Sequence, residues 1–171
     1  MHVFSIAEFQ NHYEKIRKRT LRAVSLITEE TIDFTLDERM FSIGDLARHI
    51  ALLELHFYQP CLQNLPPTYT GCDASFASSQ KEILQVYHQA TQGMTTILKD
   101  KSDSFLEERC QLPHGTIRVK KWLSLILEHE IHHRGQLYQL LSFKGIKVPD
   151  IFGLSSEELI KLADSNSDKR N

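Results

Sequence analysis

The sequence has little glycine, proline or cysteine, and each shortage excludes a class of fold. Seven glycines and five prolines among 171 residues disfavour a turn-rich all-β structure. The three cysteines, Cys61, Cys72 and Cys110, are an odd number and have no C-x-x-C spacing. They therefore predict reduced thiols in a cytoplasmic protein rather than a disulfide framework.

An excess of charge and long apolar runs are also missing. Twenty Lys and Arg residues against 22 Asp and Glu give a formal net charge of −2, which argues against a general affinity for nucleic acid. Apolar runs such as residues 122–127 are short and interrupted, whereas a membrane-spanning helix needs roughly 18 apolar residues. The first residues lack the basic and apolar regions of a secretory signal. We expect a cytoplasmic protein that binds neither nucleic acid nor a membrane.

Apolar residues recur at steps of three and four along the chain, the spacing of amphipathic helices. Ser5 with Glu8, and Ser42 with Asp45, provide capping residues at the start of the first two. The pattern predicts helices at about residues 5–28, 42–60, 78–99, 119–143 and 155–164.

Four long helices with little extended structure predict an all-α fold, a four-helix bundle formed as one domain by residues 1–171. A loop at 65–77 permits a crossover connection, and residues 105–119 suggest a small hairpin around a turn. The polar tail from about residue 165 is expected to fray.

The first helix carries a run of basic residues, which is most simply a solvated face but could bind an anionic ligand or an acidic partner. These residues are Lys15, Arg17, Lys18, Arg19 and Arg22.

Histidines on the fourth helix carry the main chemical signal. His129 and His133 are four residues apart, so their Cβ atoms lie about 5–6 Å from each other on one helix face. Both fall on the apolar stripe with Trp122, Ile126 and Leu137 and should point inward. That spacing allows two imidazoles to bind one metal ion at about 2.0–2.1 Å.

The segment from His129 to His133 also matches HExxH, in which the glutamate, here Glu130, is the general base of a zinc protease. No histidine follows His133, so the third ligand of metzincins is missing. Glu157 or Glu158 is a distant carboxylate alternative. A metalloprotease is therefore a remote alternative.

A third histidine ligand is available upstream, on the second predicted helix. His49 lies on that helix's inward stripe, and a bundle can place it beside the fourth helix. His56 lies nearer the end of the same helix and is the less favoured ligand. Asp45, one turn before His49, could orient its ring or simply cap the helix. His132 is offset from the His129–His133 line and is expected to be an interhelical partner or to support a metal ligand from outside the site.

Four segments carry a resemblance to a known family: Asp45–Ile50, Leu112–Thr116, His129–Leu137 and Gly145–Pro149. Together they resemble the DinB family, within the broader DinB/YfiT-like superfamily, over roughly residues 4–152. The resemblance implies an up-down-down-up bundle, often paired as a homodimer, with a divalent metal bound by His49, His129 and His133. Relatives in the superfamily include thiol-dependent transferases and isomerases.

These observations predict a metal-dependent enzyme acting on a small molecule, with zinc or nickel as the first candidates for the ion. The metal would activate water for hydrolysis or, by analogy with the family, bind the thiolate of a low-molecular-weight thiol for group transfer. Two alternatives stay open: a non-catalytic metal-binding stress-response protein and a dimeric interaction module. A fourth protein ligand, such as His56 or Glu130, would favour a structural site over a catalytic one.

Overall fold

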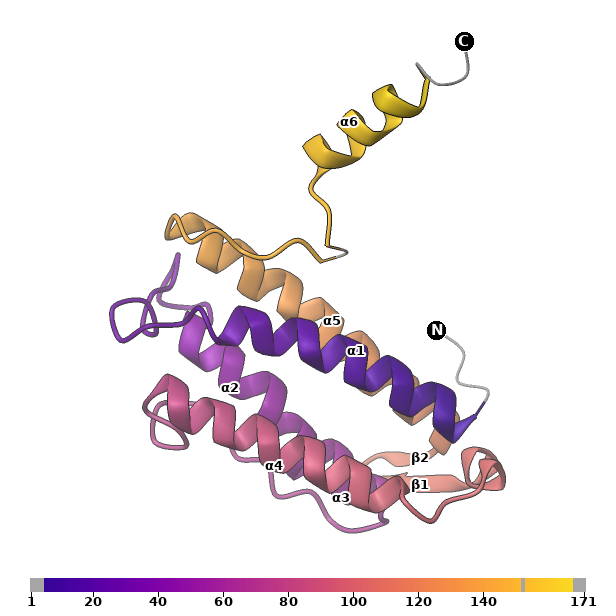
Figure 1. The fold of residues 1–171 in the computed structure, drawn as a ribbon. Coiled ribbons are helices and arrows are strands. Elements are labelled where there is room, and N and C mark those ends of the chain that lie inside the picture. The colour runs from indigo at the N-terminus through magenta and orange to yellow at the C-terminus, as the bar shows by residue number, and fades with distance from the viewer. Residues whose placement is uncertain (1–4, 152, 168–171) are drawn as a thin grey trace.

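The computed structural model describes residues 5–151 and 153–167, which form helices and one small hairpin (Figure 1). The long predicted helices are confirmed, with ends that differ by a few residues. In chain order the elements are α1 (Ile6–Val24), α2 (Ile43–Leu53), the π-helix η1 (Glu54–Tyr58), α3 (Gln59–Leu62), α4 (Gln80–Leu98), the 3-10 helix η2 (Asp103–Glu107), β1 (Arg109–Leu112), β2 (Gly115–Arg118), α5 (Val119–Phe143) and α6 (Ser156–Ser167).

The predicted caps begin the first two helices. The Ser5 hydroxyl accepts a hydrogen bond from the Glu8 amide at 3.1 Å. At the start of α2, the Ser42 hydroxyl accepts from the Asp45 amide at 3.0 Å, while the Asp45 carboxylate accepts from the Ser42 amide at 3.2 Å. Each pair satisfies backbone N–H groups that have no partner inside the helix.

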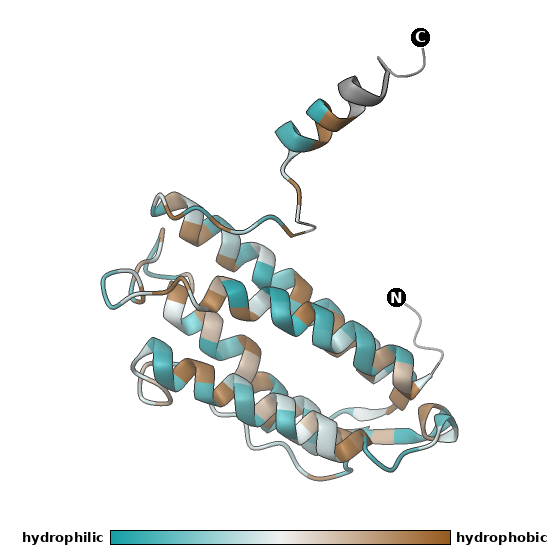
Figure 2. Ribbon diagram, in the orientation of Figure 1, coloured by the Kyte–Doolittle hydropathy of each residue, from teal (hydrophilic) through white to brown (hydrophobic). Residues whose placement is uncertain are grey.

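The four long helices run up, down, down and up. In Figure 1, α2 and α4 point the same way because the loop at 63–79 returns along the bundle, and α1 and α5 run in the opposite direction. α1 packs against α4 and α5, and α2 packs against the same two helices. Brown and teal residues interchange along these helices in Figure 2, as expected of amphipathic helices. The predicted all-α fold and its topology are confirmed.

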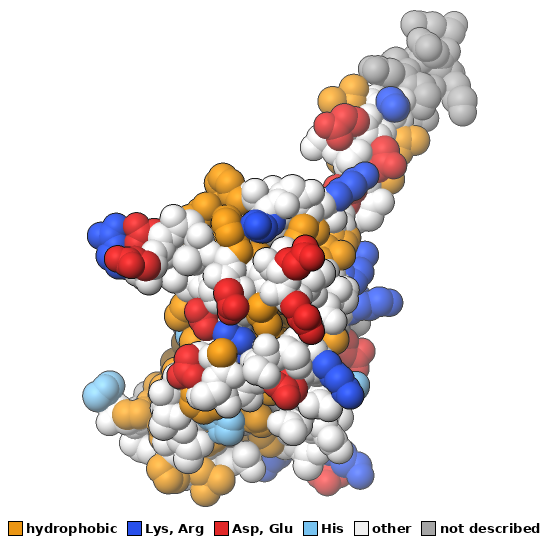
Figure 3. Space-filling view, turned by 90° about the vertical axis from the view of Figure 1, so that its left-hand side faces the viewer, with side chains coloured by type: hydrophobic (Ala, Val, Ile, Leu, Met, Phe, Trp, Pro, Cys, Tyr) orange, Lys and Arg blue, Asp and Glu red, His pale blue; other side chains and the backbone are white. Residues whose placement is uncertain are grey.

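The hairpin and the C-terminal helix refine the predicted boundaries. β1 and β2 pair antiparallel, with Cys110 opposite Ile117, and η2 replaces the extended segment expected before them. α6 continues to Ser167, beyond the expected start of fraying, and residues 168–171 lie outside the described part. Figure 3 shows α6 standing clear of the bundle. No helix in the described ranges is long and apolar enough to cross a membrane.

The sequence offered two ends for the second helix, Pro60 or the Pro-containing cluster at 64–67. The helix continues beyond Pro60, through the π turn of η1 into α3, and ends at Leu62, just before that cluster. Pro60 has no N–H to donate to the His56 carbonyl four residues earlier. That carbonyl instead accepts a hydrogen bond from the Thr68 amide at 2.8 Å. The proline therefore leaves a backbone acceptor to which the returning loop is attached.

Buried charges occupy the middle of the bundle. The side chain of Arg17 is 3% exposed, so the expectation of a solvated face is wrong for this member of the basic run. Arg17 hydrogen-bonds to Glu54 of η1, and its Nη2 lies 3.0 Å from Oε2 of Glu130 on α5. The Tyr13 hydroxyl donates to Glu54 at 2.6 Å. Burial opposes the positive charge, but Glu130 and Glu54 raise the pKa of Arg17 above its ordinary value.

Arg134 of α5 joins this interior region. Its side chain is buried, and Nη1 donates to the Ile16 carbonyl of α1 at 3.3 Å. Two arginines on the packed faces of α1 and α5 thus accompany the two buried glutamates. The packed faces of α1 and α5 are therefore apolar near the helix ends and charged near the middle.

Replacing Arg17 should destabilise the bundle strongly. Arg17→Met leaves Glu54 and Glu130 buried without their shared cation, which should lower the free energy of unfolding by about 3–5 kcal/mol. Lys18→Met is the matched control, because Lys18 is exposed one position along α1, and it should change stability by less than about 0.5 kcal/mol. Urea unfolding followed by circular dichroism measures both. Equal midpoints for the two variants would contradict the role of Arg17.

Candidate metal centre

The contact between α2 and α5 brings three histidines together: His49 from α2, and His129 and His133 from α5. One ring nitrogen from each lies within 4.8 Å of the others. The Nε2 atoms of His49 and His129 are 3.2 Å apart. Ring centroids are separated by 5.1 Å for His49 and His129, 4.7 Å for His49 and His133, and 4.5 Å for His129 and His133.

This spacing fits one shared metal ion. Two nitrogens bound to zinc at 2.0–2.1 Å with a tetrahedral angle lie about 3.3–3.4 Å apart, close to the 3.2 Å between the Nε2 atoms of His49 and His129. If both rings carry their proton on Nδ1, their Nε2 lone pairs face each other and repel, and a cation between them would relieve the contact. Imidazole nitrogens are good ligands for zinc, nickel, iron and copper.

Hydrogen bonds to Nδ1 of His133 and of His49 favour the tautomer that leaves the Nε2 lone pair free for a metal. Nδ1 of His133 lies 2.7 Å from Oε1 of Gln136. An amide oxygen only accepts, so Nδ1 carries the proton and Nε2 keeps its lone pair. Nδ1 of His49 lies 3.0 Å from the Tyr69 hydroxyl, which can accept the proton of Nδ1 in the same way. Such partners hold metal-binding histidines in one tautomer and orientation.

Burial keeps the three rings in the neutral form that binds metal. Burial first, and then the neighbouring histidines His133, His49 and His132, lower the pKa of His129 to about 3. Burial, followed by the influence of His133, lowers the pKa of His49 to about 4. The pKa of His133 is lowered by burial first and by His132, while Gln136 opposes the shift. At neutral pH the group therefore carries no protons that a metal would have to displace.

Aromatic side chains cover the histidine group on two sides. The Phe41 ring centroid lies 5.0 Å from that of His49, and the Tyr58 ring centroid lies 5.3 Å from that of His129. Trp122 supports Tyr58, because its ring packs at 4.9 Å and its Nε1 donates to the Tyr58 carbonyl at 3.1 Å. These contacts limit the access of water to the rings.

Tyr69 and Gln136 are the hydrogen-bonding partners of the histidines that the sequence did not predict. Gln136 follows His133 by three positions on one helix, so helical spacing could have indicated the contact. Tyr69 reaches His49 from the crossover loop, 20 residues along the chain. Its place depends on the hydrogen bond between Thr68 and the His56 carbonyl, for which no sequence pattern exists.

Glu130, the candidate base, faces α1 and not the histidine group between α2 and α5. Its side chain is 2% exposed and its carboxylate pairs with Arg17. Burial raises its pKa, and Arg17 opposes that shift. The environment is that of an ion pair inside the bundle, which differs from that of a base acting on metal-activated water. A zinc protease needs this glutamate as its general base, so the arrangement argues against the HExxH protease interpretation.

The other candidate partners of the histidines also lie elsewhere. Asp45 caps α2 and accepts a hydrogen bond from Arg48 at 2.7 Å, so its observed role is the cap. Nδ1 of His56 lies 3.3 Å from the Thr68 hydroxyl, outside the metal-ligand group. His132 is exposed, with its ring centroid 4.8 Å from that of His133.

The cysteines are all unpaired and buried. Burial raises the pKa of each thiol, to about 11 for Cys110. A thiol with a raised pKa forms little of the reactive thiolate.

Comparison with known proteins decides the family. The profile of the DinB family matches residues 1–163. The chain belongs to the DinB family. It is 26% identical to YrdA of Bacillus subtilis strain 168, a protein described as uncharacterized, over 164 residues that cover 92% of this chain and 93% of YrdA.

Solved structures of DinB-like proteins share the fold. A Bacillus cereus DinB-like protein superposes with a TM-score of 0.74 at 19% identity, over 88% of this chain and 99% of that one. YfiT of Bacillus subtilis, described as a probable metal-dependent hydrolase with an unusual four-helix bundle topology, superposes with a TM-score of 0.68 at 15% identity, over 83% and 89% of the two chains. These likenesses establish the bundle architecture of the DinB chain described here.

Removing the Tyr69 hydroxyl should weaken metal binding without unfolding the protein. Tyr69→Phe leaves Nδ1 of His49 without its partner, and such losses typically cost 10–100-fold in metal affinity. Competition with a chromogenic zinc chelator measures the change. Tyr138→Phe is the control, since the Tyr138 hydroxyl has no hydrogen-bond partner, and it should bind zinc as the wild type does. Unchanged affinity in Tyr69→Phe would show that the Tyr69 contact does not support a ligand.

Proposed function

We propose that this DinB protein is a metal-dependent enzyme that holds one divalent ion through His49, His129 and His133. The observation that carries the proposal is the convergence of three neutral imidazoles, with Nε2 atoms of His49 and His129 at 3.2 Å. Zinc and nickel are the first candidates, because both accept imidazole ligands.

The number of protein ligands favours catalysis over a structural brace. Structural zinc sites are closed by four protein ligands, whereas catalytic sites use three and leave a position open. Within the described ranges the group contains three histidines and no carboxylate or thiol. His56 and Glu130, the two residues that could have closed the site, are engaged with Thr68 and Arg17.

Hydrolysis is the reaction that we propose. When bound, a divalent ion in such a site supplies a Lewis acid that activates water at neutral pH. The description of YfiT, a protein of the same fold, as a probable metal-dependent hydrolase supports this reaction class. The thiolate of a small thiol would use the same open position, which makes thiol transfer the alternative outcome of a substrate screen. A homodimer and a cytoplasmic location stay predictions.

The chain's own residues have separate tasks in this proposal. The three histidines offer lone pairs without first losing protons. Tyr69 and Gln136 hold the rings of His49 and His133 from behind. Tyr58 and Phe41 cover the rings and reduce competition from bulk water. Such preorganisation fixes the open coordination position before substrate arrives.

Metal analysis of protein purified without a histidine tag tests the site. The wild type should contain or take up about one equivalent of zinc or nickel, and the double variant His129→Ala, His133→Ala should take up none. His132→Ala is the control, because His132 is exposed on the same helix segment, and it should keep the metal. Added metal should raise the melting temperature of the wild type and the control only. A wild type that takes up no metal would refute the proposal.

The open coordination position needs its own measurement, because a structural brace would also bind one equivalent. Cobalt(II)-loaded protein should change its visible absorption when acetohydroxamate is added, since the hydroxamate can occupy only an open position. A spectrum that does not respond would indicate a closed, non-catalytic site. Screening of esters, amides and thiol acceptors should then proceed with the loaded wild type and the histidine double variant side by side.

A further inference from the structure

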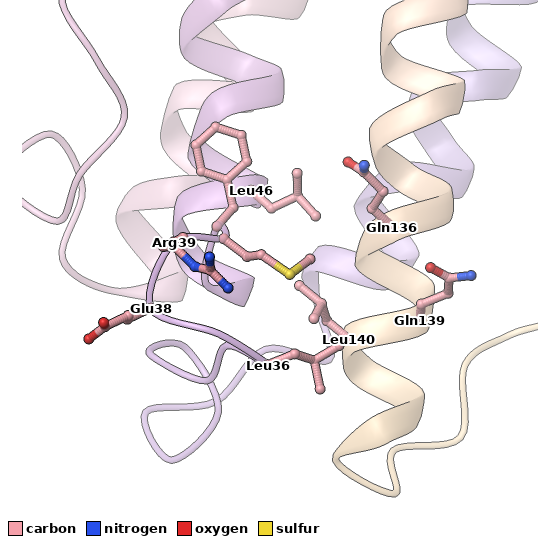
Figure 4. A pocket seen from close by; sticks show the side chains of 9 residues that line it. Leu36, Glu38, Arg39, Leu46, Gln136, Gln139 and Leu140 are labelled. Carbon is pink, nitrogen blue, oxygen red and sulfur yellow. The ribbon is translucent and has the colours of Figure 1, made fainter.

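A pocket of about 420 Å³ lies one helical turn from the histidine group (Figure 4). The loop between α1 and α2 forms one wall with Leu36, Met40 and Phe41, and α5 forms the opposite wall with Gln136 and Leu140. Figure 4 shows Leu36 close to Leu140 and Gln136 across the opening from Leu46. The volume is within the range of small-molecule sites.

Two residues belong both to this pocket and to the surroundings of the histidines. Phe41 packs on the ring of His49, and Gln136 accepts the hydrogen bond of His133. Leu46 of the pocket precedes His49 by one turn of α2, and Gln136 follows His133 by one turn of α5. A ligand in the pocket would therefore reach the histidine group at one end.

The lining is apolar and leaves large side chains in contact with solvent. Leu36, Met40 and Phe41 are 49%, 55% and 42% exposed, although they lie within six residues of one another. Burial of such side chains by a ligand is favourable, because it removes apolar area from water. The structure thus holds a contiguous apolar surface beside its candidate metal site.

Two charged side chains, Glu38 and Arg39, belong to the lining, and Figure 4 shows the Glu38 carboxylate pointing away from the pocket. Arg39 donates to both carboxylate oxygens of Asp37 at 2.9 Å, so it offers no free cation to an anionic ligand. The remaining polar groups on α5 are the amides of Gln136 and Gln139. The chemistry of the pocket therefore suits an uncharged body with few hydrogen-bonding groups.

We infer that this pocket binds the apolar body of the substrate, an aliphatic or aromatic group whose polar, reacting end lies at the histidines. The inference rests on the proposed function, because it assumes that the metal binds at His49, His129 and His133. It adds the substrate class: small amphiphilic compounds are preferred over small polar ones. Continuity with the histidine group favours this occupant over a second copy of the chain.

Chain-length dependence of a metal-directed probe tests the inference. Zinc-loaded protein is titrated by calorimetry with acetohydroxamate and with octanohydroxamate, which share the metal-binding head and differ by six methylenes. Even partial burial of those methylenes should make the longer probe bind at least tenfold more tightly. The double variant Leu36→Ser, Met40→Ser should lose this preference and keep its affinity for acetohydroxamate. Leu65→Ser is the control, because Leu65 is exposed to a similar extent, 54%, outside the pocket.

Each outcome separates the pocket from the metal site. Equal affinities for the two probes in a zinc-loaded wild type would overturn the pocket inference and leave the metal site intact. Failure to take up zinc would refute the proposed function. The same comparison is then made with octanamide and acetamide on the metal-free protein, where the absence of a length preference overturns the inference. A wild-type dimer that Leu36→Ser, Met40→Ser dissociates in sedimentation would assign the surface to a second copy and also overturn it.

Discussion

The guanidinium of Arg17 is shared by two carboxylates from different elements, and the arrangement of the candidate site depends on that sharing. Glu54 begins the π turn that continues α2, and Glu130 lies on α5. His49 precedes Glu54 by five residues, and His129 directly precedes Glu130. A buried cation between the two acids therefore fixes how α2 and α5 lie relative to α1. Apolar packing tolerates small sliding movements, whereas unpaired buried charge does not.

The histidine group uses the same two helices on a different side. Glu130 faces α1, while His129 and His133 face α2, so neighbouring residues of α5 serve packing and the candidate chemistry separately. This division explains why a glutamate inside an HExxH pattern does not act beside the histidines. In the described chain, the imidazoles are supported instead by neutral groups, Tyr69 and Gln136.

Helical periodicity and capping residues were enough to predict the bundle, and spacing on one helix face was enough to select His129 and His133. Among the described residues, His49 and not His56 lies in one group with His129 and His133. Three features could not be predicted from the sequence. Arg17 resembles its exposed basic neighbours until its partners on other elements are known. The Glu130 carboxylate turns away from the histidines because it pairs with Arg17 of α1. Tyr69 depends on a loop whose path is set by one backbone hydrogen bond.

The attachment of the crossover loop also determines where the chain can vary in length. Thr68 is held by the His56 carbonyl that Pro60 leaves free, and Arg48 donates to the carbonyls of Cys72 and Ala77 at 2.7 and 2.8 Å. Residues 73–76 lie between Cys72 and Ala77, the two residues that Arg48 holds, and are exposed. Insertions there would keep Tyr69 at His49 and α4 in its place, whereas a length change between residues 60 and 68 would displace Tyr69. Relatives of different length should therefore differ at 73–76.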